Sequence, residues 1–159
     1  MIAARIVIAG ALLVTGLAAY ARPATPAAPV AADLVLARQA GMDMSATTLN
    51  FLKGASGNGT PLKNLAFAAG GLGKWADAMP ALFADSTRSV PSRAQPAIWV
   101  NRSDFAAKAK AFADATKAMA DAARADDKAA FDAALASTAA SCKGCHDSYQ
   151  APPPAAKAG

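Results

Sequence analysis

The sequence predicts an all-α protein, built as an antiparallel four-helix bundle. From residue 33 onward, apolar side chains recur at every third or fourth residue, as in an α-helix, and do not alternate as in a strand. Helix-stopping residues separate these stretches: G-N-G at 57–59, three prolines within 80–96 and P-P-P at 152–154. Amphipathic helices joined mostly by short loops bury their apolar stripes by packing antiparallel around one core.

The first two helices have clear start and stop signals. The first is predicted to begin at Asp33, a good N-cap, and to run to about Leu52, because glycines follow from Gly54. The second has Thr60 as its expected N-cap and Pro61 at the first helical position. Its apolar residues form a heptad seam made of Leu62, Leu65, Ala69, Leu72, Ala76 and Met79. Pro80 is expected near its end, because proline disrupts a helix interior.

The other two helices follow a long connection. Residues 81–98 lack a helical period and predict a long ordered loop or crossover. The third helix is expected from Asn101 as N-cap, with Asp104 placed as in a capping box, to about Asp126. Its buried face carries Phe105, Phe112 and Met119, seven residues apart. The fourth spans about 127–149, with one side formed by Phe131, Leu135, Cys142, Cys145, His146 and Tyr149.

Three glycines interrupt the second predicted helix. Gly70, Gly71 and Gly73 each cost about 1 kcal/mol relative to alanine in a helix interior. They indicate either a kink or the close approach of another backbone. A helix-crossing contact in a homodimer and local fraying remain the two interpretations.

The chain begins with a segment typical of a secretory signal peptide over residues 1–21. Arg5 is its positive charge, residues 6–19 are uncharged and Ala19-Tyr20-Ala21 is a cleavage motif. An uncleaved anchor is the alternative, although the run is short for a membrane span. Cleavage would leave no stable membrane insertion and a periplasmic protein. Residues 22–32 then form a Pro/Ala tether, 33–150 a single domain and 151–159 a disordered Pro/Ala tail.

The charge of the chain excludes one class of partner. There are 16 Lys and Arg against 11 acidic residues, all of them aspartate. The basic residues are scattered singly and form no stripe, so no nucleic-acid partner is expected. The small positive excess would favour docking to an acidic redox partner protein.

Both cysteines and the only histidine lie within residues 142–146, C-K-G-C-H, and C-x-x-C-H is the attachment motif of c-type haem. Thiols one helical turn apart can add to the two vinyl groups of one porphyrin, and the adjacent imidazole can serve as the proximal iron ligand. A redox dithiol would be expected beside a βαβ pattern, and a zinc site would need two further ligands. The sequence offers neither, so it predicts one covalent haem c on the last helix.

With this motif on the last helix, 14 residues from the C-terminus, the chain resembles the class II c-type cytochromes, the cytochrome c-prime family. The markers, within about 33–150, are R-Q-x-x-M at 38–42, P-A-L-F at 80–83, P-x-I-W at 96–99 and C-K-G-C-H-D-S-Y at 142–149. The resemblance implies thioethers at Cys142 and Cys145 and His146 as fifth ligand. It also implies propionate contacts from Arg38 and Gln39, Gln95 along the haem edge and Met42 over the sixth coordination site.

The bundle topology supports the distal assignment independently. The beginning of the first helix lies beside the end of the fourth, so Met42 and His146 share one end of the bundle. Arg38 and Gln39 lie one turn before Met42 on the same helical face. Taken alone, Arg38 could instead be a surface charge whose stem covers apolar surface. The remaining large residues are expected to fill the core: Met79, Met119, Trp75, Trp99 and Phe83.

Two functions follow from the two states of Met42. If its thioether binds the iron, the haem is low-spin with His146/Met42 ligation, and the protein is a one-electron carrier, which is the reading the sequence favours. If Met42 only packs near the iron, the site is five-coordinate and high-spin, and it binds NO or CO. Gln150 stands where family members often carry a basic residue, which weakens the gas-binding reading. An enzyme is not expected, because no histidine remains as a general base.

Overall fold

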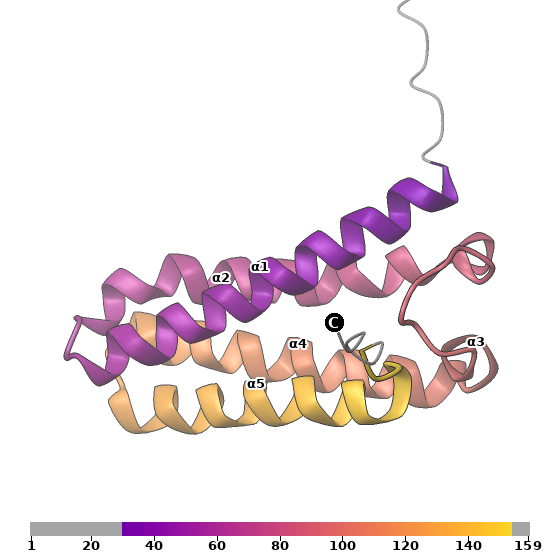
Figure 1. The fold of residues 1–159 in the computed structure, drawn as a ribbon. Coiled ribbons are helices and arrows are strands. Elements are labelled where there is room, and N and C mark those ends of the chain that lie inside the picture. The colour runs from indigo at the N-terminus through magenta and orange to yellow at the C-terminus, as the bar shows by residue number, and fades with distance from the viewer. Residues whose placement is uncertain (1–29, 154–159) are drawn as a thin grey trace, which may run out of the picture.

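The computed structural model describes residues 30–153, and within this range it is helical, with no strand. Four long helices form the bundle: α1 (Ala31–Gly57), α2 (Leu62–Ala78), α4 (Arg102–Ala125) and α5 (Lys128–Tyr149) (Figure 1). The predicted all-α four-helix bundle is therefore confirmed. The predicted signal peptide (1–21) and most of the predicted tether and tail lie outside the described residues. No helix within 30–153 is long and apolar enough to span a membrane.

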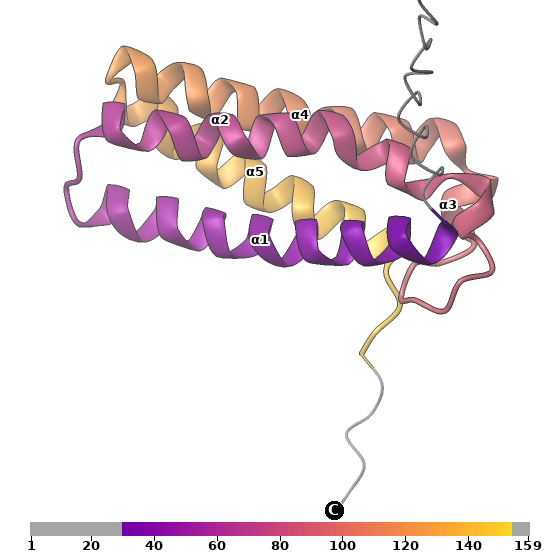
Figure 2. The same ribbon diagram turned by 90° about the horizontal axis from the view of Figure 1, so that it is seen from above.

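Successive long helices run in opposite directions. α1 and α2 lie side by side and are joined by a short turn, as Figure 2 shows from above. The most extensive helix contacts join α2 to α4 and α4 to α5. Towards its N-terminus α1 diverges from α5, which leaves the two helices apart at the end of the bundle where α5 finishes (Figure 1).

The core consists of two clusters of buried side chains. The first lies towards the α1–α2 turn and includes the fully buried Leu52, Met119 and Phe131. The second lies towards the crossover and includes Phe105 and Phe112. Every residue of the predicted heptad seam in α2 and its continuation is buried, from Leu62 to Met79. The helical period in the sequence thus identified the core face correctly.

Two of the predicted helix starts need correction. α1 begins at Ala31, not at Asp33, and Val30 is its N-cap without a side-chain hydrogen bond. Asp33 lies in the first turn, where its charge still complements the helix dipole. The N-cap of α2 is Pro61 and not Thr60, whose backbone N–H instead donates to the carbonyl of Ala55 at 3.0 Å.

The predicted end of the first helix and the predicted capping box were also wrong. α1 continues to Gly57, because Gly54 is exposed and a helix tolerates glycine there at a modest cost. Asn101 does occupy the N-cap position of α4, but its side chain makes no cap hydrogen bond. Asp104 does not complete a capping box, since its carboxylate accepts a hydrogen bond from Tyr149.

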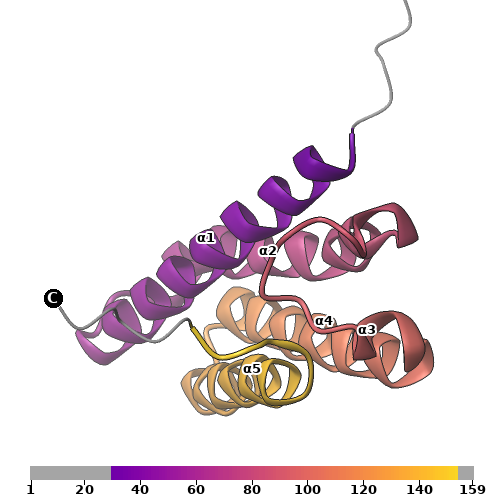
Figure 3. The same ribbon diagram turned by 45° about the vertical axis from the view of Figure 1, so that its right-hand side comes forward.

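The crossover between α2 and α4 is ordered, as predicted, but it contains three short helical turns that were not. These are η1 (Met79–Phe83), η2 (Asp85–Thr87) and α3 (Ala97–Val100). Figure 3 shows the crossover passing from the end of α2 to the start of α4. It also reaches the end of α5, where an isolated antiparallel bridge joins Ala94 to Gln150.

Among residues 30–153, no neighbouring atom requires glycine at Gly70, Gly71 or Gly73 of α2. α2 is one uninterrupted α-helix across them. A Cβ on Gly70 or Gly71 would meet nothing within 4 Å, and on Gly73 it would make an ordinary contact with Thr116. The close backbone approach that the glycines suggested is therefore absent among residues 30–153.

Candidate haem-binding site

Helix α5 presents the C-x-x-C-H motif to two adjoining clefts. The first, with an empty volume of about 800 Å³, lies between α1, α4 and α5. The second, of about 990 Å³, lies between α1, the crossover and the end of α5. Four residues line both clefts: Met42, Met79, Cys145 and His146. The two clefts thus form one site around the histidine.

The two cysteines of the motif are half-buried on the wall of this site, and His146 is more exposed. Both cysteines are free, and burial raises the pKa of the Cys142 and Cys145 thiols. Burial lowers the pKa of His146, the positive charge of Arg93 lowers it further, and Asp147 opposes the change. These effects together favour the neutral imidazole, which is the form that binds a metal.

One cleft is mainly apolar and the other is polar, which matches the apolar ring and the acidic edge of a haem. The first is walled mainly by apolar side chains, among them Ala46, Leu49, Leu72, Ala109 and Phe112. The second carries polar and charged groups, including Arg38, Gln39, Ser92, Arg93 and Gln150. A haem has an apolar ring and two acidic propionates, so the first cleft suits the ring and the second the propionates.

Arg38 provides a sharper test of whether a haem fits. Its side chain is buried, with 3% exposure, and no carboxylate among residues 30–153 pairs with it. Burial lowers the pKa of its guanidinium. A buried charge is costly unless an opposite charge approaches it. A propionate in the second cleft would be that missing charge, and the residues present therefore fit the haem that the motif implies.

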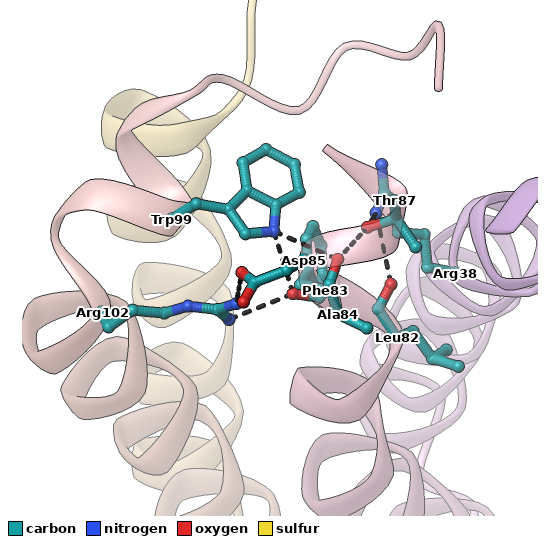
Figure 4. Close-up of polar contacts among 8 residues, drawn as sticks. All are labelled: Arg38, Leu82, Phe83, Ala84, Asp85, Thr87, Trp99 and Arg102. Carbon is teal, nitrogen blue, oxygen red and sulfur yellow. Dashed lines mark hydrogen bonds and ion pairs between the residues drawn. The ribbon is translucent and has the colours of Figure 1, made fainter. Parts of the chain in front are cut away.

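The guanidinium of Arg38 is also bonded to the crossover (Figure 4). Its Nη1 donates to the carbonyl of Leu82 at 3.2 Å and to Oγ1 of Thr87 at 3.0 Å. Its Nη2 donates to Oγ of Ser92 at 2.9 Å, and the group stacks 4.5 Å from the ring centre of Phe83. The alternative in which Arg38 is only a surface charge is therefore wrong.

The comparisons with known proteins agree with this site. The sequence model of the family described as Cytochrome C' matches residues 33–150. The chain belongs to the cytochrome c' family. Cytochrome c' proteins carry a covalently attached haem c, so the predicted cofactor is confirmed for the family of this chain.

Individual relatives are moderately similar. Cytochrome c' of Pararhodospirillum photometricum is 37% identical over 75 residues, which are 46% of this chain and 60% of that protein. The match therefore spans less than two thirds of that relative. The solved cytochrome c' from Thermochromatium tepidum has a TM-score of 0.72 and 27% identity, and covers 78% of this chain and 98% of its own. A nitric oxide complex of a cytochrome c prime variant from Alcaligenes xylosoxidans has a TM-score of 0.70 and 26% identity, covering 77% and 98%.

Most of the site residues predicted from the sequence come together in this cytochrome c' fold. Arg38, Gln39, Met42, Cys142, Cys145 and His146 all line one or both clefts. Gln95 lines neither, and its backbone N–H donates to the carbonyl of Tyr149 at 2.9 Å. Its place is thus the junction between the crossover and the end of α5.

Sequence reasoning missed three features of the site. Met79 was expected to be core filler, and although it is buried it also lines both clefts. The heptad seam could not reveal this, because a seam residue that faces a cleft has the same spacing as one that faces a helix. Arg93 comes from the crossover, which has no period. Tyr149 donates from its Oη to Oδ2 of Asp104 at 2.6 Å, an interaction between two helices that no local motif announces.

The aromatic residues expected to pack do so. Phe83 contacts Phe105 with ring centres 4.9 Å apart and Trp99 at 6.5 Å. Trp75 packs against Gly41 of α1, where its ring occupies the space of a side chain. The indole N–H of Trp75 is buried and has no hydrogen-bond partner within residues 30–153.

Proposed function

We propose that this chain is an exported haem protein of the periplasm whose iron binds a diatomic gas such as NO or CO. The observation that carries the proposal is the first cleft, which His146 lines and whose walls are formed mainly by apolar side chains. When bound, the haem supplies an iron that can accept a small gas as a ligand. The nitric oxide complex of the cytochrome c prime variant from Alcaligenes xylosoxidans supports this choice, as the molecule described there carries that gas.

The chain's own residues have separate tasks in this proposal. Cys142 and Cys145 would hold the porphyrin edge through thioethers, and His146 would bind the iron from the proximal side. Arg38 would neutralise a propionate, and Gln39, exposed beside it, would bond the same group. Met42 and the apolar residues around it would exclude water and limit the size of what enters. The chain has only one histidine, and we propose no proton-transfer catalysis, since no general base would remain.

The one-electron carrier remains the second candidate. Met42 lines both clefts together with His146, so a thioether is available on the wall of the site. Ligation by that sulfur would favour electron transfer with redox partner proteins over gas binding. We place it second because the relatives in solved complexes include a gas-bound one.

Spectroscopy of the haem-loaded protein separates the two. The gas-binding function predicts a high-spin ferric spectrum and prompt binding of CO to the ferrous protein. The carrier predicts a low-spin spectrum, the weak near-infrared band of thioether ligation and slow CO binding. Replacing Met42 by Leu should change little in the first case, whereas in the second it should abolish the band and open the site. A low-spin wild type would overturn the proposal.

We also propose that two copies of this chain pair through helix α2. Phe67 is 93% exposed there, beside the open glycines Gly70 and Gly71. An apolar groove next to it is lined by residues of α1 and α2, including Gly41, Met44, Phe67, Gly71 and Trp75. Each helical glycine costs stability that the isolated chain does not recover. A second backbone crossing at this position would recover it.

The charges on the same face are self-complementary. Lys63 and Asp77 both lie seven residues from Gly70, in opposite directions along the helix. In a two-fold antiparallel pairing centred on Gly70, Lys63 of each copy lies opposite Asp77 of the other. Between them Phe67, Gly70 and Gly71 lie at helical spacing on this face and are uncharged, and Lys74 is the next exposed charge.

Charge reversal tests this pairing. Lys63→Asp should shift the protein towards monomer in sedimentation equilibrium, and adding Asp77→Lys should restore the dimer. Lys53→Asp, an exposed lysine of α1, is the matched control and should leave the assembly unchanged. A monomeric wild type, or a double variant no better than the single one, would rule out this dimer.

A further inference from the structure

Residues 82–87 of the crossover accept hydrogen bonds from α1 on one side and from α3 and α4 on the other, at the end of the bundle that holds His146. On one side stands Arg38 of α1, with its hydrogen bonds to Leu82 and Thr87 and its stacking on Phe83 (Figure 4). Because the guanidinium and Thr87 are both buried, the hydrogen bond between them is shielded from water. α1 is therefore attached to the crossover at one definite position along its length.

On the other side the same segment is attached to α3 and α4. Nε1 of Trp99 donates to the carbonyls of Phe83 and Ala84 at 3.1 and 3.2 Å. Nη1 of Arg102 donates to the carbonyl of Phe83 at 3.0 Å, and its Nη2 pairs with Asp85 at 2.6 Å. The crossover segment thus connects α1 to α3 and the start of α4 through hydrogen bonds on both sides.

The connection continues to the helix that carries the histidine. Asp104, in the first turn of α4, accepts the hydrogen bond of Tyr149, which lies three residues after His146 in α5. A second link runs from the crossover to the end of α5, where the backbone N–H of Gln95 donates to the carbonyl of Tyr149. The crossover therefore connects α1 to the helix that carries His146 and helps to fix their relative position.

We propose that Arg38 is a positioning residue that sets how far Met42 stands from His146, and thereby how easily a gas reaches the distal side of the haem. Met42 lies one turn after Arg38 on the same face of α1. We call the hydrogen bonds from Arg38 to Leu82, Thr87 and Ser92 the clamp. The second cleft lies between α1 and the end of α5, so the clamp determines how far apart these two helices stand. The inference rests on the proposed gas-binding function and goes beyond a contact between Arg38 and a propionate.

Thr87 separates the two roles of Arg38. Its hydroxyl accepts from Arg38 and donates to the carbonyl of Ala84 at 2.7 Å, and it is fully buried. It lines neither haem cleft. Thr87→Val therefore removes an acceptor from the clamp while leaving the charge of Arg38 beside the propionate position.

The experiment measures the rate constant of CO association to the haem-loaded ferrous protein. Thr87→Val and Arg38→Lys should each raise it roughly threefold or more, within the range of couplings inside one hydrogen-bond network. In a Met42→Ala background the same substitutions should leave the rate unchanged, because the side chain they displace is absent. Thr116→Val is the matched control, since Thr116 is equally buried but bonds only within α4.

Ser92→Ala provides a third variant, at an exposed residue that, unlike Thr87, also lines the second cleft. It removes the exposed acceptor of Nη2 and should act in the same direction as Thr87→Val, with a smaller effect. Unchanged CO rates in all three folded variants would refute the clamp. If the substitutions raised the CO association rate constant equally in the wild-type and Met42→Ala backgrounds, the clamp would also be refuted, because the increase would then not depend on the Met42 side chain.

A failure of the proposed function has a different outcome. If no variant with haem attached binds CO, including Met42→Ala, the gas-binding function is refuted. The wild type alone could resist CO and show the near-infrared band of thioether ligation. In that case the intensity of the band tests the clamp. Thr87→Val should then weaken it and Thr116→Val should not, and an unaltered band in Thr87→Val would refute the clamp.

Discussion

Replacing Gly41 by Ala tests the packing that holds α1 in place beside the haem site. A Cβ at this position would lie 2.2 Å from Cη2 of Trp75, 2.4 Å from Cζ3 and 2.6 Å from Cζ2. Carbon atoms in contact are normally separated by about 3.5 to 4.0 Å. The indole or the helix must therefore move by about 1 Å or more to admit one methyl group.

The expected cost follows from two opposing effects. Overpacking a filled site costs about 1 to 3 kcal/mol, whereas replacing a helical glycine by alanine returns up to about 1 kcal/mol. With the full glycine gain, we therefore expect Gly41→Ala to lower the free energy of unfolding by up to about 2 kcal/mol. Gly54→Ala is the matched control in the same helix, because a Cβ there meets nothing within 4 Å. It should raise the free energy of unfolding.

Urea unfolding of the haem-loaded variants, followed by far-ultraviolet circular dichroism, measures both effects. The two variants should differ by the overpacking cost alone, about 1 to 3 kcal/mol. Because Gly41 immediately precedes Met42, the visible spectrum of Gly41→Ala should also differ from that of the wild type. A Gly41→Ala protein as stable as Gly54→Ala would show that α1 does not pack on Trp75 as described.

Three further predictions concern stability elsewhere in the bundle. The hydrogen bond to Asp104 raises the pKa of Tyr149 to about 12 from 10.0, so its contribution to stability is complete below pH 10.0 and is lost as the pH rises towards 12. Tyr149→Phe should remove this part of the alkaline stability loss, and identical pH profiles would contradict the pairing. Phe131→Ala should cost about 3 to 5 kcal/mol in denaturant unfolding, because Phe131 is fully buried, and a cost below about 1 kcal/mol would be inconsistent with that burial. Lys117→Gln removes only an exposed ion pair with Asp121 and should change stability by less than about 0.5 kcal/mol, so a larger loss in the same assay would argue against a solvated pair.

The sequence by itself determined the helices and the chemistry of the attachment site. Both depend on residues close together in the chain. The seam of α2 has a regular spacing, and every member of it is buried as the period predicted. The five residues 142–146 contain all the sulfur and imidazole needed to attach one haem, and their close spacing can be read without knowing the tertiary structure.

Only the tertiary structure decided what surrounds that motif. The partners of Arg38 lie 44 to 54 residues away, in a crossover whose sequence has no period to read. Met79 shares the spacing of its core neighbours, yet it faces a cleft because α1 diverges from α5 at that end. Helical period reports which side of a helix is apolar, whereas hydrogen bonds between distant segments report which helices meet and how far apart they stand. We infer that the separation of α1 and α5 sets the position of Met42, and hence the space open to a ligand of the haem.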